Sequence, residues 1–258
     1  MGRAKDEMMR YEEEEPMREW IEETYGDDAG EEGSDTWEEA VEAYEHYCQR
    51  QIELEEEYFW QAELEWYIES QSQIGIFNNQ IGSVKRLLEV DVDKETQFSL
   101  FVMLYGHVVA AVEAYLASTF IHKVTNSEEL IRKLVETDPV FSNMKFSLQE
   151  IYEKQESLKL TVATYLKKLI FHKLNKIKPM YKSVLNHEFG DITWLFDAIE
   201  VRHHCVHRAG LDIEGKKVEL SAHSINELVE NATLLVISVE NSVNKIADTD
   251  APISLGFN

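Results

Sequence analysis

The run from Thr36 to Ser72 contains neither glycine nor proline, the two residues that most often interrupt helices and form turns. A β-rich chain needs a turn about every 8–12 residues, so this run cannot belong to one. The whole chain has only 11 glycines and four prolines among 258 residues, so turn-forming residues are scarce outside this run as well. We therefore predict an all-α fold.

Helical patterns and charge divide the chain into four regions. Residues 1–33 are charge-dense, and we expect them to form a flexible or loosely helical arm. Residues 34–93 read as an acidic, aromatic-rich helical region. Residues 94–250 read as a helical bundle, and residues 251–258 as a tail.

Within the bundle, apolar periodicity predicts helices over about 97–121, 126–136 and 147–185. A further helix is expected between Asp191, a good N-cap, and Gly210, a good stop. The segment LDIEGKKVEL then reads as a small hairpin-like insert, and Ser224 is expected to cap the last helix.

The negative charge is concentrated in the first part of the chain. The net charge is −24, but residues 1–70 hold 25 acidic and five basic residues, a net of −20, which leaves −4 for the rest. The acidity therefore excludes nucleic-acid binding only for the N-terminal part. Eight aromatic residues in that part could form a packing stripe, or a mimic of nucleic acid that masks a basic surface: Trp37, Tyr44, Tyr47, Tyr58, Phe59, Trp60, Trp66 and Tyr67.

Residues 97–121 are apolar and long enough to span a bilayer. They include Gln97, His107 and Glu113, however, and no cluster of Lys and Arg flanks them, so we expect a buried core helix and no membrane partner. Two cysteines, Cys48 and Cys205, and an N-terminus without an apolar leader fit a protein of the reducing cytoplasm.

The basic residues gather in one place. Between Ser157 and His187 there are seven lysines and no acidic residue. This run is either a surface that faces phosphates or an ordinary solvated helix face. Five of its lysines are candidate RNA-binding residues: Lys167, Lys168, Lys173, Lys176 and Lys178.

Three of the nine histidines stand within five residues, in the sequence EVRHHCVHRAG at positions 200–210. At about 100° per residue, the apolar stripe of Ile192, Leu195, Phe196 and Ile199 continues onto Arg202, His203 and Val206, whereas His204 and Cys205 are expected to point elsewhere. We expect Arg202 and His207 to lie on opposite shoulders of this stripe, about 140° apart.

Four chemistries fit the cluster. A zinc site on His203 and His207 would need further ligands, and no CxxC or HExxH motif is present. A Cys205 nucleophile would need a base on its own side of the helix. Arginine and histidine together suit phosphodiester cleavage, because arginine can hold the phosphate oxygens and imidazole can transfer protons. The fourth possibility is an ordinary polar helix end.

Arg202, four intervening residues and His207 match an R-x4-H pattern, and VRHHCVHRAG resembles the motif helix of the HEPN superfamily. The hairpin-like insert and the final helix after it also resemble that family, as does VVAAVEAYL around Glu113 upstream. The resemblance covers about residues 94–248.

The resemblance implies an up-and-down helical bundle that dimerises with its motif helices side by side. It also implies a metal-independent endoribonuclease of the toxin or antiphage-defence type, which uses the RNA 2′-hydroxyl for transesterification and no cofactor. By this resemblance Arg202 would hold the phosphate, His207 would be the general acid/base, His203 would hydrogen-bond within the site, and Glu113 would orient Arg202.

Two expectations remain open at this level. The alternative to an enzyme is a non-catalytic HEPN-type scaffold that binds a partner protein or a nucleotide. The acidic N-terminal region is expected to fold over the lysine run until a regulatory, antitoxin or phage-derived protein displaces it; instead it could belong to the bundle or bind a separate basic partner.

Overall fold

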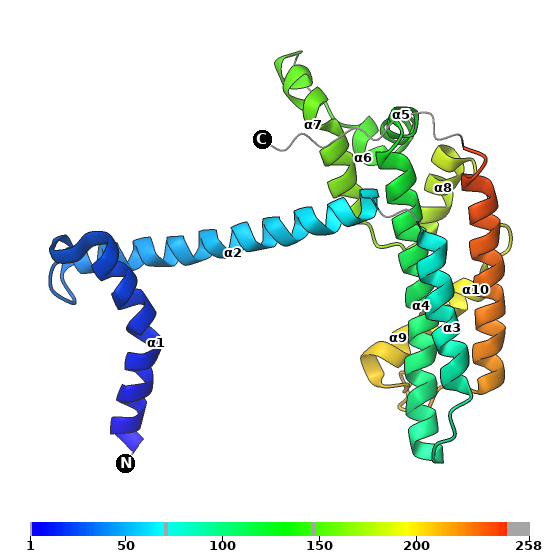
Figure 1. Ribbon diagram of the computed structural model, residues 1–258, viewed down its shortest axis with the longest axis horizontal. Helices are drawn as coiled ribbons and strands as arrows, with labels where there is room; N and C mark the ends of the chain where they lie inside the picture. The colour runs from blue at the N-terminus through cyan, green and yellow to red at the C-terminus, as the bar shows by residue number, and fades with distance from the viewer. Residues whose placement is uncertain (1, 70–71, 146–147, 247–258) are drawn as a thin grey trace. The chain divides into compact units, whose positions relative to one another are not determined.

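The computed structural model describes residues 2–69, 72–145 and 148–246 (Figure 1). Within these ranges the chain is helical, and the all-α helical bundle predicted from the sequence is confirmed. The chain divides into two compact units, residues 1–63 and residues 64–258.

The first unit is a helical hairpin. Helix α1 (Gly2–Tyr25) lies in the acidic segment expected to be a flexible or loosely helical arm. A short 3-10 helix, η1 (Gly26–Ala29), leads to α2 (Asp35–Glu69). The absence of glycine and proline allowed one long helix or two abutting ones here, and the structure has one uninterrupted helix. A small core of Ile21, Ala29 and Ala40 holds the hairpin together.

The second unit is built around α4 (Lys94–Thr125). Figure 1 shows α3 (Gln73–Leu88) and α10 (Ala222–Val243) beside it, and both pack against it. Helix α3 lies in the region 34–93 that was assigned to the acidic segment, yet its Phe77, Ile81 and Val84 are buried in the core of the bundle.

Helix α4 has the length and composition to cross a membrane, and 61% of its most apolar window is buried inside the fold. Asp93 starts the helix by accepting hydrogen bonds from the amides of Glu95 and Thr96. Packing against α3, α9 and α10 accounts for its apolar sequence.

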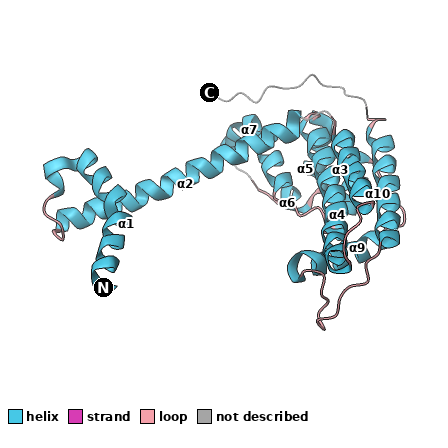
Figure 2. Ribbon diagram, turned by 60° about the horizontal axis from the view of Figure 1, so that its bottom comes forward, coloured by secondary structure: helices cyan, strands magenta, loops and turns pink. Residues whose placement is uncertain are grey.

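The predicted helix over 147–185 is wrong in one respect, because it is two helices. Helix α7 (Leu148–Lys167) and helix α8 (Leu174–Leu185) are separated by a turn at residues 168–173. Helix α5 (Glu128–Thr137) and the single turn α6 (Pro139–Ser142) precede them (Figure 2). The turn folds α8 back, so that Tyr181 donates a hydrogen bond to the carbonyl of Leu116 on α4 over 2.6 Å.

A hairpin-like turn connects α9 (Thr193–Arg208) to α10, as expected. Leu211 and Lys217 form an isolated antiparallel bridge, and the amide of Asp212 donates to the carbonyl of Lys216 over 2.8 Å. The cap of α10 is Ser221, three residues before the predicted Ser224, and the two side chains form a reciprocal capping box.

Candidate functional site

The histidine-rich motif occupies the last two turns of α9, which packs against α4 (Figure 1). Asp191 holds the start of this helix, because its carboxylate accepts hydrogen bonds from the hydroxyl of Thr193 at 2.7 Å and from its amide at 2.9 Å. These bonds keep the pKa of Asp191 below its ordinary value, so the carboxylate stays charged at the positive end of the helix.

The motif helix ends at two residues in the left-handed region, Ala209 (φ 51°) and Gly210 (φ 83°). The amide of Gly210 donates to the carbonyl of His204 over 3.0 Å, which satisfies one carbonyl of the last turn. A Cβ on Gly210 would stand 2.5 Å from Cγ2 of Val102 on α4, so only glycine lets the end of α9 approach α4 this closely.

The predicted buried stripe of α9 is right in its first part, because Ile192 and Leu195 are buried and Ile199 packs against the core, but the helix is rotated relative to the rest of the prediction. Leu195, Ala198 and Cys205 are buried, whereas the side chains of Phe196 and Val206, which were placed in the stripe, are 40% and 55% exposed. The small side chains of Ala198 and Cys205 let α9 come close to α4, and the bulkier residues are left at the edge. Cys205 therefore faces the core, contrary to the prediction.

Arg202 lies between Ala198 and Cys205 on this buried side, and its side chain is 23% exposed. Its Nη2 is 3.9 Å from Oε2 of Glu113 on α4, a distance at which the charges attract without a hydrogen bond. Among the described residues, Nε of Arg202 and Oε1 of Glu113 are buried and have no hydrogen-bond partner. Glu113 thus stands where it can orient Arg202, and both groups have unused hydrogen-bonding capacity.

His172 is the site residue that sequence reasoning missed. It lies in the turn between α7 and α8, and its Nδ1 is 3.3 Å from the same Oε2 of Glu113. Its side chain is 34% exposed, so it forms one wall of a partly open site. No spacing in the sequence links His172 to the motif, because the chain reversal at residues 168–173 creates the contact.

The remaining motif residues fall on two other faces of α9. The rings of His203 and His207 are exposed side by side, with centroids 4.6 Å apart. His204 is half-buried, and its Nδ1 lies 3.1 Å from Nη1 of Arg208. The pKa of His203 lies below its ordinary value, first because its ring is partly desolvated and then because the neighbouring His207 and Arg208 disfavour its protonation. His203 is therefore neutral at pH 7 and able to accept a proton.

The five candidate RNA-binding lysines lie around the same turn. Lys167 ends α7, and the exposed Lys168 and Lys173 lie in the turn with His172. Lys176 and Lys178 follow in α8, and Nζ of Lys176 stands 5.0 Å from the ring centre of Tyr165. The turn that supplies His172 to Glu113 therefore also carries two of these lysines, and the other three lie in the helices on either side of it.

Two of the alternative chemistries find no support here. No group of three or more His, Cys, Asp or Glu side chains that could hold a metal occurs in the described ranges. Cys205 is 5% exposed, and burial raises the pKa of its thiol to about 11, which opposes formation of a nucleophilic thiolate.

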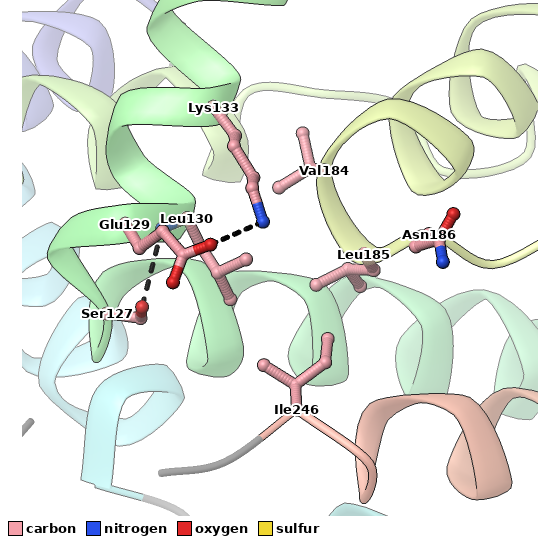
Figure 3. A pocket seen from close by; sticks show the side chains of 8 residues that line it. All are labelled: Ser127, Glu129, Leu130, Lys133, Val184, Leu185, Asn186 and Ile246. Atoms are coloured by element: carbon pink, nitrogen blue, oxygen red, sulfur yellow. Dashed lines mark hydrogen bonds and ion pairs between the residues drawn. The ribbon is translucent and has the colours of Figure 1, made fainter. Parts of the chain in front are cut away.

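A separate pocket of about 270 Å³ lies between α5 and α8 (Figure 3). Leu130, Val184, Leu185 and Ile246 give it an apolar lining, and Lys133 and Glu129 form an ion pair of 2.6 Å at its side. None of the predicted site residues lines it, so the pocket and the motif are distinct features of the bundle.

No protein-family model, curated protein or solved structure matches this chain.

Proposed function

We propose that the protein is a metal-independent endoribonuclease of HEPN type whose site is the C-terminal half of α9. The observation that carries the proposal is the environment of Arg202. The guanidinium of Arg202 is half-buried, lies beside Glu113, and has an Nε without a hydrogen-bond partner. The exposed rings of His203 and His207 lie on a neighbouring face of the same part of α9. Such an arginine can bind a further anion through its unused Nε. A phosphodiester is an anion whose cleavage neighbouring imidazoles can catalyse by proton transfer.

In the proposed reaction the RNA 2′-oxygen attacks the adjacent phosphorus while the bond from phosphorus to the 5′-oxygen breaks. The products are a 2′,3′-cyclic phosphate and a free 5′-hydroxyl. Arg202 stabilises the charge on the non-bridging oxygens, and Glu113 orients it. His207 transfers the proton that leaves the 2′-hydroxyl or the one that the 5′-oxygen requires, and His203 hydrogen-bonds within the site. No cofactor takes part.

The active form of the proposed enzyme is a homodimer. One motif offers a single Arg202 and a single His207, and a second copy related by a twofold axis supplies the second set. Apolar side chains beside the motif support this arrangement, because Val206 and Phe196 on α9 and Met103 on α4 are exposed, Met103 by 63%. Burial of these side chains in an isologous interface would stabilise the dimer.

The decisive experiment measures cleavage of total RNA by the purified protein in EDTA, followed by analysis of the 3′ ends. We expect cyclic phosphate or 3′-phosphate ends, and we expect Arg202→Ala and His207→Ala each to abolish cleavage. His204→Ala is the matched control, since His204 lies on another face of the same helix turn. Absence of cleavage under every condition would favour the non-catalytic scaffold, and activity that EDTA removes would favour a metal site.

The dimer and the biological role need separate measurements. Sedimentation should give a dimer of the 30.0 kDa chain, weakened by Val206→Asp; a monomer at every active concentration would contradict the composite site. The proposed role as a toxin or antiphage effector predicts that expression arrests growth of a bacterial host and that Arg202→Ala relieves the arrest.

A further inference from the structure

The hairpin of the first unit shows what one face of α2 binds. Met17, Trp20 and Ile21 of α1 pack on Trp37, Ala40 and Val41 of α2, and the ring of Trp20 stacks on Tyr47 at 5.1 Å. Ile21 is completely buried and Ala40 is 2% exposed, so this contact is a small but closed core. This face of α2 therefore accepts the apolar side of another helix.

The same face continues beyond the end of this contact. Trp37, Tyr44, Gln51 and Tyr58 recur every seven residues, which keeps them on one side of α2. Around the last of them the face is bare. The side chains of Tyr58 and Phe59 are each 71% exposed, and Leu54 is 51% exposed.

The rim of this bare face is acidic. Glu53, Glu55 and Glu56 are exposed beside it, and α2 as a whole carries 12 acidic residues and one basic residue, Arg50. Two copies of α2 would bring these charges together, which disfavours pairing of the helix with itself. Nucleic acid and anionic lipid are repelled for the same reason.

We propose that the face around Leu54, Tyr58 and Phe59 is a docking surface for a partner protein, and that its occupant is a basic amphipathic helix. The apolar side of that helix packs on Tyr58 and Phe59 as Trp20 of α1 packs on Tyr44 and Tyr47. Lysine or arginine on its flanks pairs with the glutamates of the rim. Within the first unit, Arg18 of α1 forms an arginine–glutamate pair of this kind with Glu32 in the turn before α2, at 2.7 Å. This inference is independent of the proposed nuclease activity.

The test uses the full chain and a synthetic probe. The probe is a fluorescein-labelled peptide of about 21 residues, with leucine at the two apolar positions of each heptad and lysine at most others. Its control has the same composition in a scrambled order without an apolar face. We expect the amphipathic peptide to bind at physiological salt, and Tyr58→Ser/Phe59→Ser to weaken binding by at least about tenfold.

His46→Ser is the matched variant, because this exposed residue lies on another side of α2 from Tyr58 and Phe59, and it should bind as the wild type does. Circular dichroism should show the same melting curve for all three proteins, since every substituted side chain is exposed. Equal binding of the scrambled peptide, or unchanged binding by Tyr58→Ser/Phe59→Ser, would overturn the proposal. A dimer in sedimentation that Tyr58→Ser/Phe59→Ser dissociates would assign the face to a second copy and also overturn it.

Discussion

Nδ1 of His172 lies 3.3 Å from Oε2 of Glu113, closer than Nη2 of Arg202, which faces the same oxygen at 3.9 Å. The first contact is short enough for a hydrogen bond and the second is not. His172 is therefore the principal partner of Glu113 in this structure, and Glu113 is shared between the turn at 168–173 and the motif helix.

A double-mutant cycle between His172→Ala and Glu113→Gln measures this partnership without any assumption about activity. We expect a coupling free energy of about 0.5–1 kcal/mol from urea unfolding, because both side chains are only partly shielded from water. The matching cycle between Arg202→Ala and Glu113→Gln should give a smaller value, since that contact is longer. A larger coupling to Arg202 would show that the two contacts are ranked wrongly.

Gly210→Ala should destabilise the fold, because alanine at φ 83° is strained and its Cβ would meet Val102 at 2.5 Å. The matched control is Gly215→Ala, where φ is 78° but nothing lies within 4 Å of the added carbon. We expect about 1 kcal/mol from the strain at either position and about 2 kcal/mol more at Gly210 from overpacking. Equal free energies of unfolding for the two variants would mean that α9 moves away from α4 at no cost.

His187 should make the stability of the bundle depend on pH. It is 2% exposed, its Nδ1 lies 2.8 Å from Oγ of Ser242, and burial lowers its pKa from the ordinary 6.5. The unfolded chain then binds a proton at a higher pH than the folded chain. Stability should therefore be complete above about pH 6.5 and decline as the pH falls from there through the folded pKa.

The check on His187 is urea unfolding of wild type and His187→Asn between pH 7.5 and pH 5. Asparagine does not titrate and its amide can still reach Ser242, so the variant should lose less stability on acidification than the wild type. If the free energies of unfolding of the two proteins fall in parallel as the pH is lowered, the pH dependence comes from groups other than His187.

The two cysteines should differ in reactivity. Cys205 is buried with a pKa of about 11, whereas Cys48 on α2 is only half-buried. At pH 8 we expect a disulfide reagent to modify one thiol of the native protein quickly and the second about a hundredfold more slowly. Cys48→Ser should abolish the fast phase, and denaturant should merge the two rates. A fast phase that persists in Cys48→Ser would place Cys205 at the surface.

Most helices could be predicted because their signals are local. The absence of glycine and proline predicts that the region of α2 is helical, as one long helix or two abutting ones, and the apolar composition of 97–121 predicts the core helix α4. The break at residues 168–173 was missed because its sequence, KLIFHK, carries no glycine or proline, and Pro179 lies later, inside α8. Tertiary packing of α8 on α4 overrides local preference there.

Residue spacing predicted the candidate site only where its residues share a helix, and Glu113 on α4 was named only from the family resemblance. Arg202, His203 and His207 are close because α9 is a helix, so their proximity follows from spacing alone. The rotation of α9 depends on how closely Ala198 and Cys205 approach α4, which the apolar pattern does not contain. His172 meets Glu113 only through the chain reversal, and a contact across 59 residues leaves no periodic signal.

The central position of α4 has a consequence for synthesis of the chain on the ribosome. Helix α4 is complete at Thr125, but the helices that cover it, α9 and α10, end only at Arg208 and Val243. At about 5–20 residues per second, the roughly 100 residues between them take about 5–20 s to make. Helix α3 can already pack on one side of α4 in that interval, but the face that α9 and α10 later bury depends on chaperones or on temporary contacts. The contact of Arg202 with Glu113 also forms only after α9 has been made, so the candidate site is among the last parts of the bundle to assemble.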